Sequence, residues 1–375
     1  MFSSFRQIIG LLILVGGLWA CSSEEEHEGL KIPPLPTQGF SSRKALDLLN
    51  QVIRQYPDAA DNYQKRAEIF FEQGNLDAAL EDINQAIELK RNIGRYYVTK
   101  ARILRAKNQI DEALKAAQRA EILNVRTPEI YVLLADLYQR VYQLNKANQY
   151  ISRTLQINPF YGEAYFYRGM IAAKLGDTTS AMVLFLRSRS LAPGFLDTYE
   201  QLSKVNFHLK KYPESLRYAE EGIRFHPKNA DLHYRRGLAF LRLTMADSAI
   251  AEFTRTIKIE PEHAGANFFA GSLLLAKEKA PAALKYLQVL EKVNPKYPGL
   301  NFLLAQCLEY TGDDDKAMDY YLREAKEHPE NRKAAGGYWR TRKRILLNNP
   351  YLRQEERYRP ALALPDKSTT SSDSI

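Results

Sequence analysis

Histidines are the first candidates for metal binding or acid–base catalysis in this sequence. There are six, at His27, His208, His226, His233, His263 and His328. No two of them lie four residues apart with a glutamate between them, which is the arrangement that a zinc-protease helix requires. His226 and His328 directly precede prolines that would end helices, so an exposed loop imidazole is the simpler interpretation. The histidines therefore predict no metal site.

An acidic run and a glycine pair are the remaining candidates for ligand chemistry. Aspartates 313–315 lack the glycine and the bidentate glutamate of a calcium-binding loop, and they are better explained as the capping start of a helix. Gly336 and Gly337 are preceded by no predicted strand, which disfavours a nucleotide-binding loop. We expect no catalytic residue, no cofactor, no metal and no small-molecule substrate.

One of the two cysteines ends an apolar N-terminal segment. Arg6 precedes an apolar run over residues 8–18, which is shorter than the roughly 18 to 20 residues that cross a bilayer. The run continues into the tetrapeptide Leu-Trp-Ala-Cys, which finishes at Cys21. This pattern predicts a secretory signal peptide over residues 1–20.

The tetrapeptide before and including Cys21 resembles the lipobox of bacterial lipoproteins, although Trp19 stands where that family usually has a small residue. The resemblance implies cleavage before Cys21, a diacylglycerol on its Sγ and acylation, for example by palmitate, of the new amine. Several acyl chains anchor a protein stably, so the mature chain would be held at a membrane. The alternative is an ordinary signal peptide with a coincidental cysteine.

The residues that follow Cys21 bear on localisation. Ser22 stands where an inner-membrane retention signal would have aspartate, so we expect delivery to the outer membrane. Glutamates 24–26 resemble the surface-export signal of Bacteroidetes lipoproteins, with a disordered acidic spacer as the equal alternative. Residues 21–40 have three prolines and no periodicity, which predicts a flexible linker. We expect an outer-membrane lipoprotein that faces the periplasm or the cell surface.

The body of the chain repeats every 34 residues. In residues 61–89, two amphipathic helical patterns surround a turn at Gly74. Steps of 34 from Tyr63 reach Tyr97, Tyr131, Tyr165 and Tyr199. A small residue of the second helix recurs in the same phase at Ala79, Ala113, Ala147, Ala181, Ser215, Ala249, Ala283 and Ala317. A lone pair of such helices cannot bury both apolar faces and needs copies stacked beside it.

This pattern resembles the tetratricopeptide repeat, a helix-turn-helix unit. Its Leu-Gly positions hold Leu134 with Ala135, Gly169, Gly237, Gly271, and Leu304 with Ala305. Its large residue in the second helix is matched by Ile83, Ile151, Phe185, Phe253, Leu287 and Tyr321. The resemblance implies an all-α fold, an α-solenoid in which the repeats form a right-handed superhelix.

Four segments make up the predicted folded region and its end. Eight consecutive repeats span residues 60–331. Residues 41–57 match a second helix one period earlier, which predicts an N-terminal capping half-repeat. Residues 332–358 contain an apolar stripe and many cations, which predicts a basic C-terminal capping helix. Residues 359–375 have no apolar pattern and should be disordered.

The fifth repeat is the weakest copy. Asn206 replaces an apolar residue there, and Ser215 and Gly222 replace alanines. We expect a soft spot or a bend at this repeat.

The surface of the repeats is the remaining place for function. In the tetratricopeptide fold the first helix of each repeat lines a concave groove, and the resemblance implies that apolar residues there bind an extended or helical segment of a protein partner. The residues at these positions are Phe166, Tyr167, Met170, Tyr234, Leu238, Leu241, Phe268, Phe269, Leu275 and Phe302. The alternative is that part of this set packs between helices as core. Gln64 and Glu68 replace the carboxylate clamp of chaperone-binding relatives, which disfavours that mode.

The closing helix offers a second candidate surface. Its cations are Arg332, Lys333, Arg340, Arg342, Lys343 and Arg344, with no acid between Glu330 and Glu355. Such a cluster would suit anionic lipid headgroups or an acidic protein. The alternative is the solvated outer face of a terminal helix.

The formal charge of +9 is modest for 375 residues and points to an anionic partner or surface without indicating nucleic acid. Together these observations predict a non-enzymatic scaffold or adaptor for an envelope complex, such as assembly, secretion or cell-wall machinery. Its expected partners are envelope proteins and, through the lipid on Cys21, the membrane, without nucleic acid. The alternative is a holdase or ligand-binding module that grips extended polypeptide or glycan in the groove.

Overall fold

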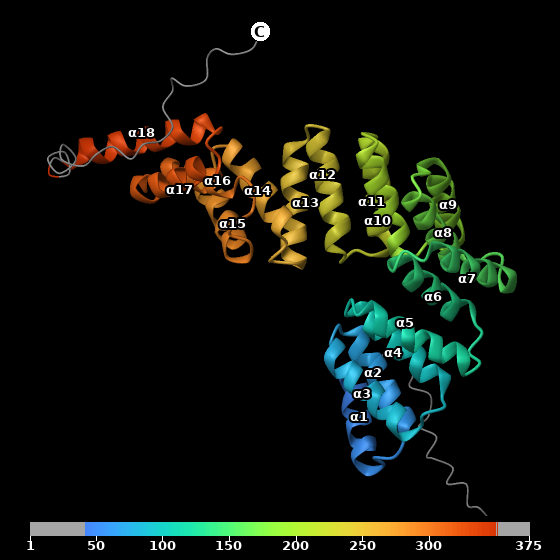
Figure 1. Cartoon of the computed structure of the whole chain (residues 1–375). Coiled ribbons are helices and arrows are strands. Elements are labelled where there is room, and N and C mark those ends of the chain that lie inside the picture. Colours follow the sequence, from blue (N-terminus) through green and yellow to red (C-terminus); the bar gives the residue numbers. More distant parts are fainter. Residues whose placement is uncertain (1–41, 350, 352–375) are drawn as a thin grey trace, which may run out of the picture. The chain divides into compact units, whose positions relative to one another are not determined.

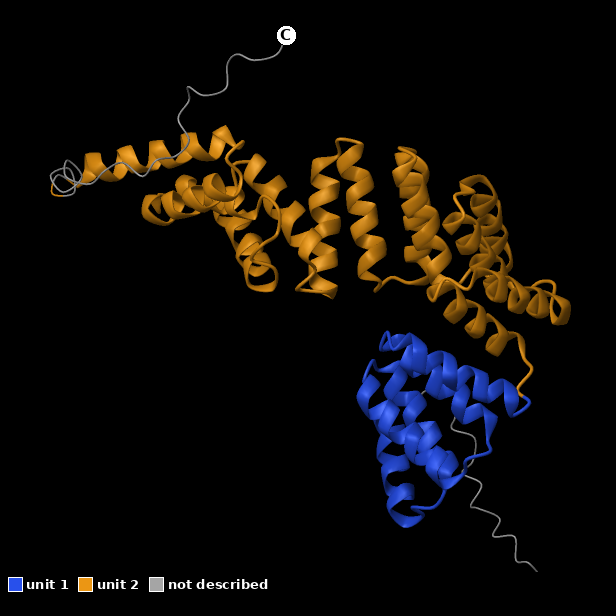
Figure 2. Cartoon of the chain, viewed as in Figure 1, with its two compact units in different colours: residues 1–124 blue, residues 125–375 orange. Residues whose placement is uncertain are grey.

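The computed structural model describes residues 42–349 and 351. Every regular element in these residues is an α-helix, eighteen in all (Figure 1), which confirms the all-α prediction. The chain divides into two compact units, residues 1–124 and 125–375 (Figure 2). The predicted signal peptide, Cys21, the whole predicted linker and the predicted C-terminal tail lie outside the described residues.

The first unit consists of five helices, of which four form two hairpins. They are α1 (Ser42–Gln55), α2 (Ala60–Glu72), α3 (Leu76–Leu89), α4 (Gly94–Ala106) and α5 (Ile110–Ile122). Helix α1 packs against α2. Arg66 of α2 joins its neighbours on both sides, because its guanidinium donates to Asn50 of α1 at 2.7 Å and to both carboxylate oxygens of Asp82 in α3 at 2.7 Å.

The second unit continues the same pattern with six hairpins and a closing helix. Its helices are α6 (Pro128–Arg140), α7 (Leu144–Ile157), α8 (Gly162–Lys174), α9 (Thr178–Leu191), α10 (Leu196–His208), α11 (Tyr212–Phe225), α12 (Ala230–Arg242), α13 (Ala246–Ile259), α14 (Ala264–Ala276), α15 (Ala280–Val293), α16 (Leu300–Thr311), α17 (Asp314–Glu327) and α18 (Arg332–Asn348). Each hairpin packs against the next, and α18 packs against α17.

The small residues that recur every 34 positions are the closest-packed points of the hairpins. All eight, from Ala79 to Ala317, are at most 1% exposed. In three repeats a glycine of the first helix makes room for a large residue of the second. A Cβ on Gly169, Gly237 or Gly271 would lie 2.6–2.7 Å from Phe185, Phe253 or Leu287, respectively. This complementarity between small and large side chains is why the period in the sequence predicts the stacking.

A left-handed turn residue recurs between the two helices of every hairpin. It is Gly74, Asn108, Tyr142, Gly176, Lys210, Thr244, Glu278 or Gly312, each with φ between 58° and 84°. Glycine adopts this region without a Cβ penalty, whereas a β-branched residue such as Thr244 is strained there. The turn geometry is therefore set by the packing of the two helices even where the residue does not favour it.

The polar residues of the fifth repeat, formed by α10 and α11, satisfy one another. Ser203 and Ser215 lie 3.1 Å apart through their hydroxyls, and each hydroxyl also donates to the other residue's carbonyl. Asn206 donates to the carbonyl of Leu202 at 2.7 Å. Gly222 lies where Leu232 and Tyr199 leave no room for a Cβ. The packing of this repeat therefore accommodates Asn206, Ser215 and Gly222, the residues that distinguish it from the other repeats.

Candidate functional site

Three residues predicted for the concave groove belong to the core instead. Phe166, Tyr167 and Leu275 are 4%, 5% and 8% exposed. The ring of Phe166 lies 5.6 Å from that of Phe185 and 5.2 Å from that of Phe195. These side chains fill the space between a helix and its neighbours and are closed to a partner, which corrects the expectation for them.

The other predicted groove aromatics are partly buried against the core. Tyr234 and Phe269 lie 5.8 and 5.5 Å from the ring of Phe253. Phe268 lies 4.9 Å from Tyr297 and packs on the apolar cluster around Leu287, and Phe302 lies 6.0 Å from Tyr321. The aliphatic members, Met170, Leu238 and Leu241, are also only partly exposed. Substituting these aromatic residues would change the packing of the core as well as any binding to a partner. Their binding role stays a prediction.

Two of the six cations on α18 are engaged in ion pairs inside the second unit. Arg340 pairs with Glu309 at 3.0 Å, and Arg344 pairs with Asp314 at 2.6 Å and with Glu309 at 3.1 Å. The acids come from α16 and α17 and therefore lie outside the α18 sequence. Arg340 and Arg344 therefore fix α18 to its neighbours, which corrects their assignment to an anionic surface.

The remaining cations of α18 differ in their surroundings. Arg332, Lys333 and Lys343 are exposed. The Arg342 guanidinium lies 4.9 Å from the ring centroid of Trp339, which is 45% exposed. Contact of these four with an anionic surface stays a prediction, and it involves a smaller cluster than the sequence indicated.

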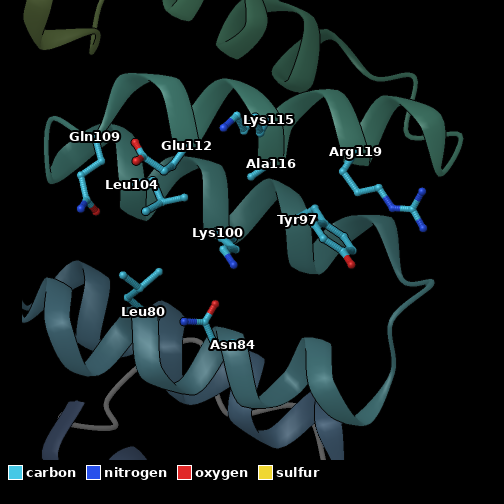
Figure 3. Close-up of a pocket in the computed structure, with 10 residues that line it drawn as sticks. All are labelled: Leu80, Asn84, Tyr97, Lys100, Leu104, Gln109, Glu112, Lys115, Ala116 and Arg119. Atoms are coloured by element: carbon cyan, nitrogen blue, oxygen red, sulfur yellow. The ribbon is translucent and has the colours of Figure 1, made fainter.

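The structure adds a hollow in the first unit that the sequence did not indicate (Figure 3). It has a volume of about 450 Å³ and is bordered by α3, α4 and α5. We call it the α3–α5 hollow, and the residues that line it are Leu80, Asn84, Tyr97, Lys100, Leu104, Gln109, Glu112, Lys115, Ala116 and Arg119.

The hollow exists because α5 contributes little side-chain volume. The residues that α5 buries are all alanines, namely Ala113, Ala116, Ala117 and Ala120. The equivalent second helices bury a large residue, for example Ile83 in α3 or Phe185 in α9. The signal in the sequence that could have located the hollow is Ala116, which lines it at a position where the other seven repeats have a larger residue.

Lys100 gives the hollow its electrostatic character. It is half-buried on α4, and its side chain lines the hollow together with the apolar residues Leu80 and Leu104 (Figure 3). Burial lowers the pKa of Lys100 below its ordinary value, because the low-dielectric surroundings disfavour the ammonium. No carboxylate among the described residues offsets this effect.

The rim of the hollow is charged and exposed. Lys115 and Arg119 of α5 add two cations, and Glu112 adds one anion. The Arg119 guanidinium lies 6.0 Å from the ring centroid of Tyr97, whose hydroxyl donates to the carbonyl of Arg91 at 3.0 Å. The hollow thus combines an apolar wall with three cations. Such an arrangement can bind a group that is partly apolar and carries a negative charge.

In residues 42–349 and 351, no three histidine, cysteine or acidic side chains gather closely enough to hold a metal ion. His233, which is buried, contacts Glu252 at 2.8 Å and the carbonyl of Pro227 at 3.1 Å. Within the same part of the chain, no helix combines the length and apolar character needed to span a bilayer.

Comparison with known families identifies the repeats. The tetratricopeptide repeat model matches residues 39–92, 209–264, 246–298 and 270–332, which together make up just under half of the chain. These segments carry tetratricopeptide repeats, and with the helix hairpins described above the chain folds as an all-α tetratricopeptide solenoid. Such repeats are protein-interaction modules and are typically not enzymes, so the repeats indicate a protein-interaction scaffold.

Solved structures are similar to this chain at low sequence identity. The Cut9–Hcn1 hetero-tetramer of the APC/C is similar with a TM-score of 0.55 and 16% identity, over 71% of this chain and 53% of that one. PilF of Pseudomonas aeruginosa gives a TM-score of 0.49 and 14% identity, over 58% and 97% of the two chains. A tetratricopeptide repeat protein of Parabacteroides merdae gives 0.44 and 18%, over 66% and 98%. No curated protein matches the sequence.

Proposed function

We propose that this chain is a lipid-anchored adaptor of the bacterial cell envelope, which binds envelope proteins through its tetratricopeptide repeats. The observation that carries the binding role is the series of eight helix hairpins in one 34-residue register. Within each unit the stacked repeats present an extended surface to a partner, because each hairpin contacts only its neighbours.

The envelope location rests on the N-terminal sequence. The short apolar run, the Leu-Trp-Ala-Cys tetrapeptide and the proline-containing linker fit a lipoprotein whose Cys21 is held in the outer membrane. The formal charge of +9 and the exposed cations Arg332, Lys333 and Lys343 favour an acidic partner or anionic headgroups close to that membrane.

The location is tested by fractionating cells that express the wild type or Cys21→Ser. The wild type should sediment with outer membranes and incorporate labelled palmitate, and the variant should do neither. A wild type that carries no lipid and stays in the cytosolic fraction contradicts the envelope proposal.

The binding role is tested by purifying the wild-type chain from solubilised envelopes and measuring the molar ratio of each co-purifying protein. One or a few partners near a fixed ratio support the adaptor. Many unrelated polypeptides at low ratios would favour the alternative function, a holdase for extended chains. Recovery of no protein above an untagged control contradicts both.

A further inference from the structure

The α3–α5 hollow pairs an apolar wall with a cation that has no ion pair among the described residues. Leu80, Leu104 and Ala116 supply the apolar contact area. Lys100 lines the same hollow, and its ammonium forms no ion pair with a described residue. A cation in such surroundings gains more from a carboxylate than an exposed lysine does, because water screens the interaction less.

The charges around the hollow define the sign of the occupant. Lys100, Lys115 and Arg119 lie on its lining, against the single anion Glu112. On α5, Glu112, Lys115 and Arg119 are spaced by three and four positions, so they share one face of the helix. Glu112 lies near the N-terminal end of α5 and Arg119 near its C-terminal end. An acidic group would be attracted toward the Arg119 end and repelled at the Glu112 end.

We infer that the α3–α5 hollow binds an acidic segment of a partner protein that presents an apolar side chain next to glutamate or aspartate. The apolar side chain lies against Leu80, Leu104 and Ala116, and the neighbouring carboxylate lies at Lys100. This inference rests on the proposed function, in which the chain binds proteins, and it adds where one partner docks and which chemistry it has.

The shape of the site favours a peptide over other anions. A volume of about 450 Å³ accommodates one or two side chains, and the hollow lies between the α2–α3 hairpin and the α4–α5 hairpin. A nucleic-acid backbone would require a track of cations without the apolar wall and without Glu112 at the rim. The Tyr97 ring beside Arg119 adds a surface on which an aliphatic or aromatic side chain can pack.

The test measures peptide binding by fluorescence anisotropy. The protein is the chain from residue 21 onward with Cys21→Ser, which retains every described residue. The probe is the fluorescein-labelled, amidated peptide Ser-Glu-Glu-Xaa-Glu-Glu-Ser, with Leu or Phe at Xaa, so that no chain terminus supplies the carboxylate. The matched peptide has Gln for every Glu.

The acidic peptide should bind about tenfold more tightly than the Gln peptide, which is the discrimination expected of one charge-assisted contact. Lys100→Met should abolish this preference. Asn84→Glu should also abolish it, because the new carboxylate would pair with Lys100. Ala116→Phe should weaken both peptides by filling the hollow. The control Lys228→Met, which removes an exposed lysine of the second unit, should change nothing.

Three results would overturn the inference: equal affinity for the two peptides, an unchanged preference in Lys100→Met, or no binding at about 1 mM peptide. Thermal unfolding of each variant shows whether it is folded. If Ala116→Phe does not fold, the peptide preference of Asn84→Glu is the test that remains. If Lys100→Met still retains the envelope partner and wild type shows no peptide preference, the hollow assignment fails and the adaptor stands. If the preference is present but no envelope protein is retained, the proposed function fails instead.

Discussion

The guanidinium of Arg340 donates two hydrogen bonds to the carboxylate of Glu309, from Nε at 3.1 Å and from Nη2 at 3.0 Å. Arg344 donates to the same carboxylate at 3.1 Å, and the Tyr321 hydroxyl donates to it at 2.6 Å. Glu309 of α16 therefore joins α17 and α18. The closing helix is held by this carboxylate as well as by apolar packing.

Glu309→Gln should loosen α18. The substitution removes a charged acceptor that serves two arginines, which costs about 2 kcal/mol of local stability. Hydrogen exchange of the α18 amides should accelerate, while exchange in the first unit should not change. Equal protection of α18 in the two proteins would contradict the role assigned to Glu309.

The effect of Glu309→Gln should depend on pH. Partial burial would raise the pKa of Glu309, but the hydrogen bonds from Arg340 and Tyr321 and the charge of Arg344 outweigh burial and lower it. A carboxyl with a lowered folded-state pKa stabilises the fold above its unfolded pKa of about 4.3 and loses this contribution as the pH falls through its folded value. The stability difference between wild type and variant should be full at pH 7 and shrink below about pH 4. A difference that is the same at pH 7 and pH 3 would contradict the pKa direction.

Thr244→Gly should stabilise the second unit. Thr244 adopts φ 61° in the turn between α12 and α13, where a β-branched residue is strained and glycine is not. The free energy of unfolding should rise by about 0.5–1 kcal/mol, measured by urea denaturation. The matched control is Gly176→Thr at the same turn position of another repeat, which should lower it by a similar amount. A decrease for Thr244→Gly would show that the turn is not strained.

Glu252→Ala should strongly destabilise the sixth repeat. The Glu252 carboxylate, 5% exposed, contacts Arg236 and Arg255 at 2.7 Å and His233 at 2.8 Å. Removing it leaves buried donors without an acceptor, and the expected loss is about 3 kcal/mol in thermal or urea unfolding. Glu260→Ala removes an exposed glutamate nearby and should stay within about 0.5 kcal/mol of wild type. Equal effects of the two substitutions would contradict the account.

The number of free thiols in the mature chain tests whether Cys21 carries a lipid. Burial raises the pKa of Cys307 to about 12, so its thiol should resist alkylation in the folded protein and react in denaturant. A thioether on Cys21 leaves Cys307 as the single titratable thiol of the mature, unfolded chain. Mass spectrometry after alkylation should find one added group. Two added groups would mean that Cys21 carries no lipid.

The fold can be predicted from the sequence because every repeat has small residues at the same buried packing positions. Positions such as Ala79 and Ala113 are confirmed as buried contacts, since only a small side chain fits between the two helices. The period therefore carries information about neighbours in space. The period does not show which side of a helix stays exposed to solvent. The sequence therefore places Phe166 and Leu275 on a surface, whereas the structure buries both side chains.

The site was harder to predict because it depends on residues far apart in the chain and on missing volume. The acid that pairs with Arg340 lies 31 residues earlier, on another helix. The α3–α5 hollow arises where α5 has a small side chain, since Ala116 lines it beside Lys100 at a position that holds a larger residue in the other repeats. The sequence pattern shows which residues are present, but it does not show the space that small residues leave in the fold.

Site-specific photo-cross-linking in living cells tests the adaptor most directly. A benzophenone amino acid at Lys115, on the exposed rim of the α3–α5 hollow, is compared with one at the exposed Lys228 of the second unit. The account predicts one discrete cross-linked species from Lys115, with an envelope protein joined through an acidic segment. No light-dependent species at Lys115, or the same array of unrelated proteins from Lys115 and Lys228, would contradict it.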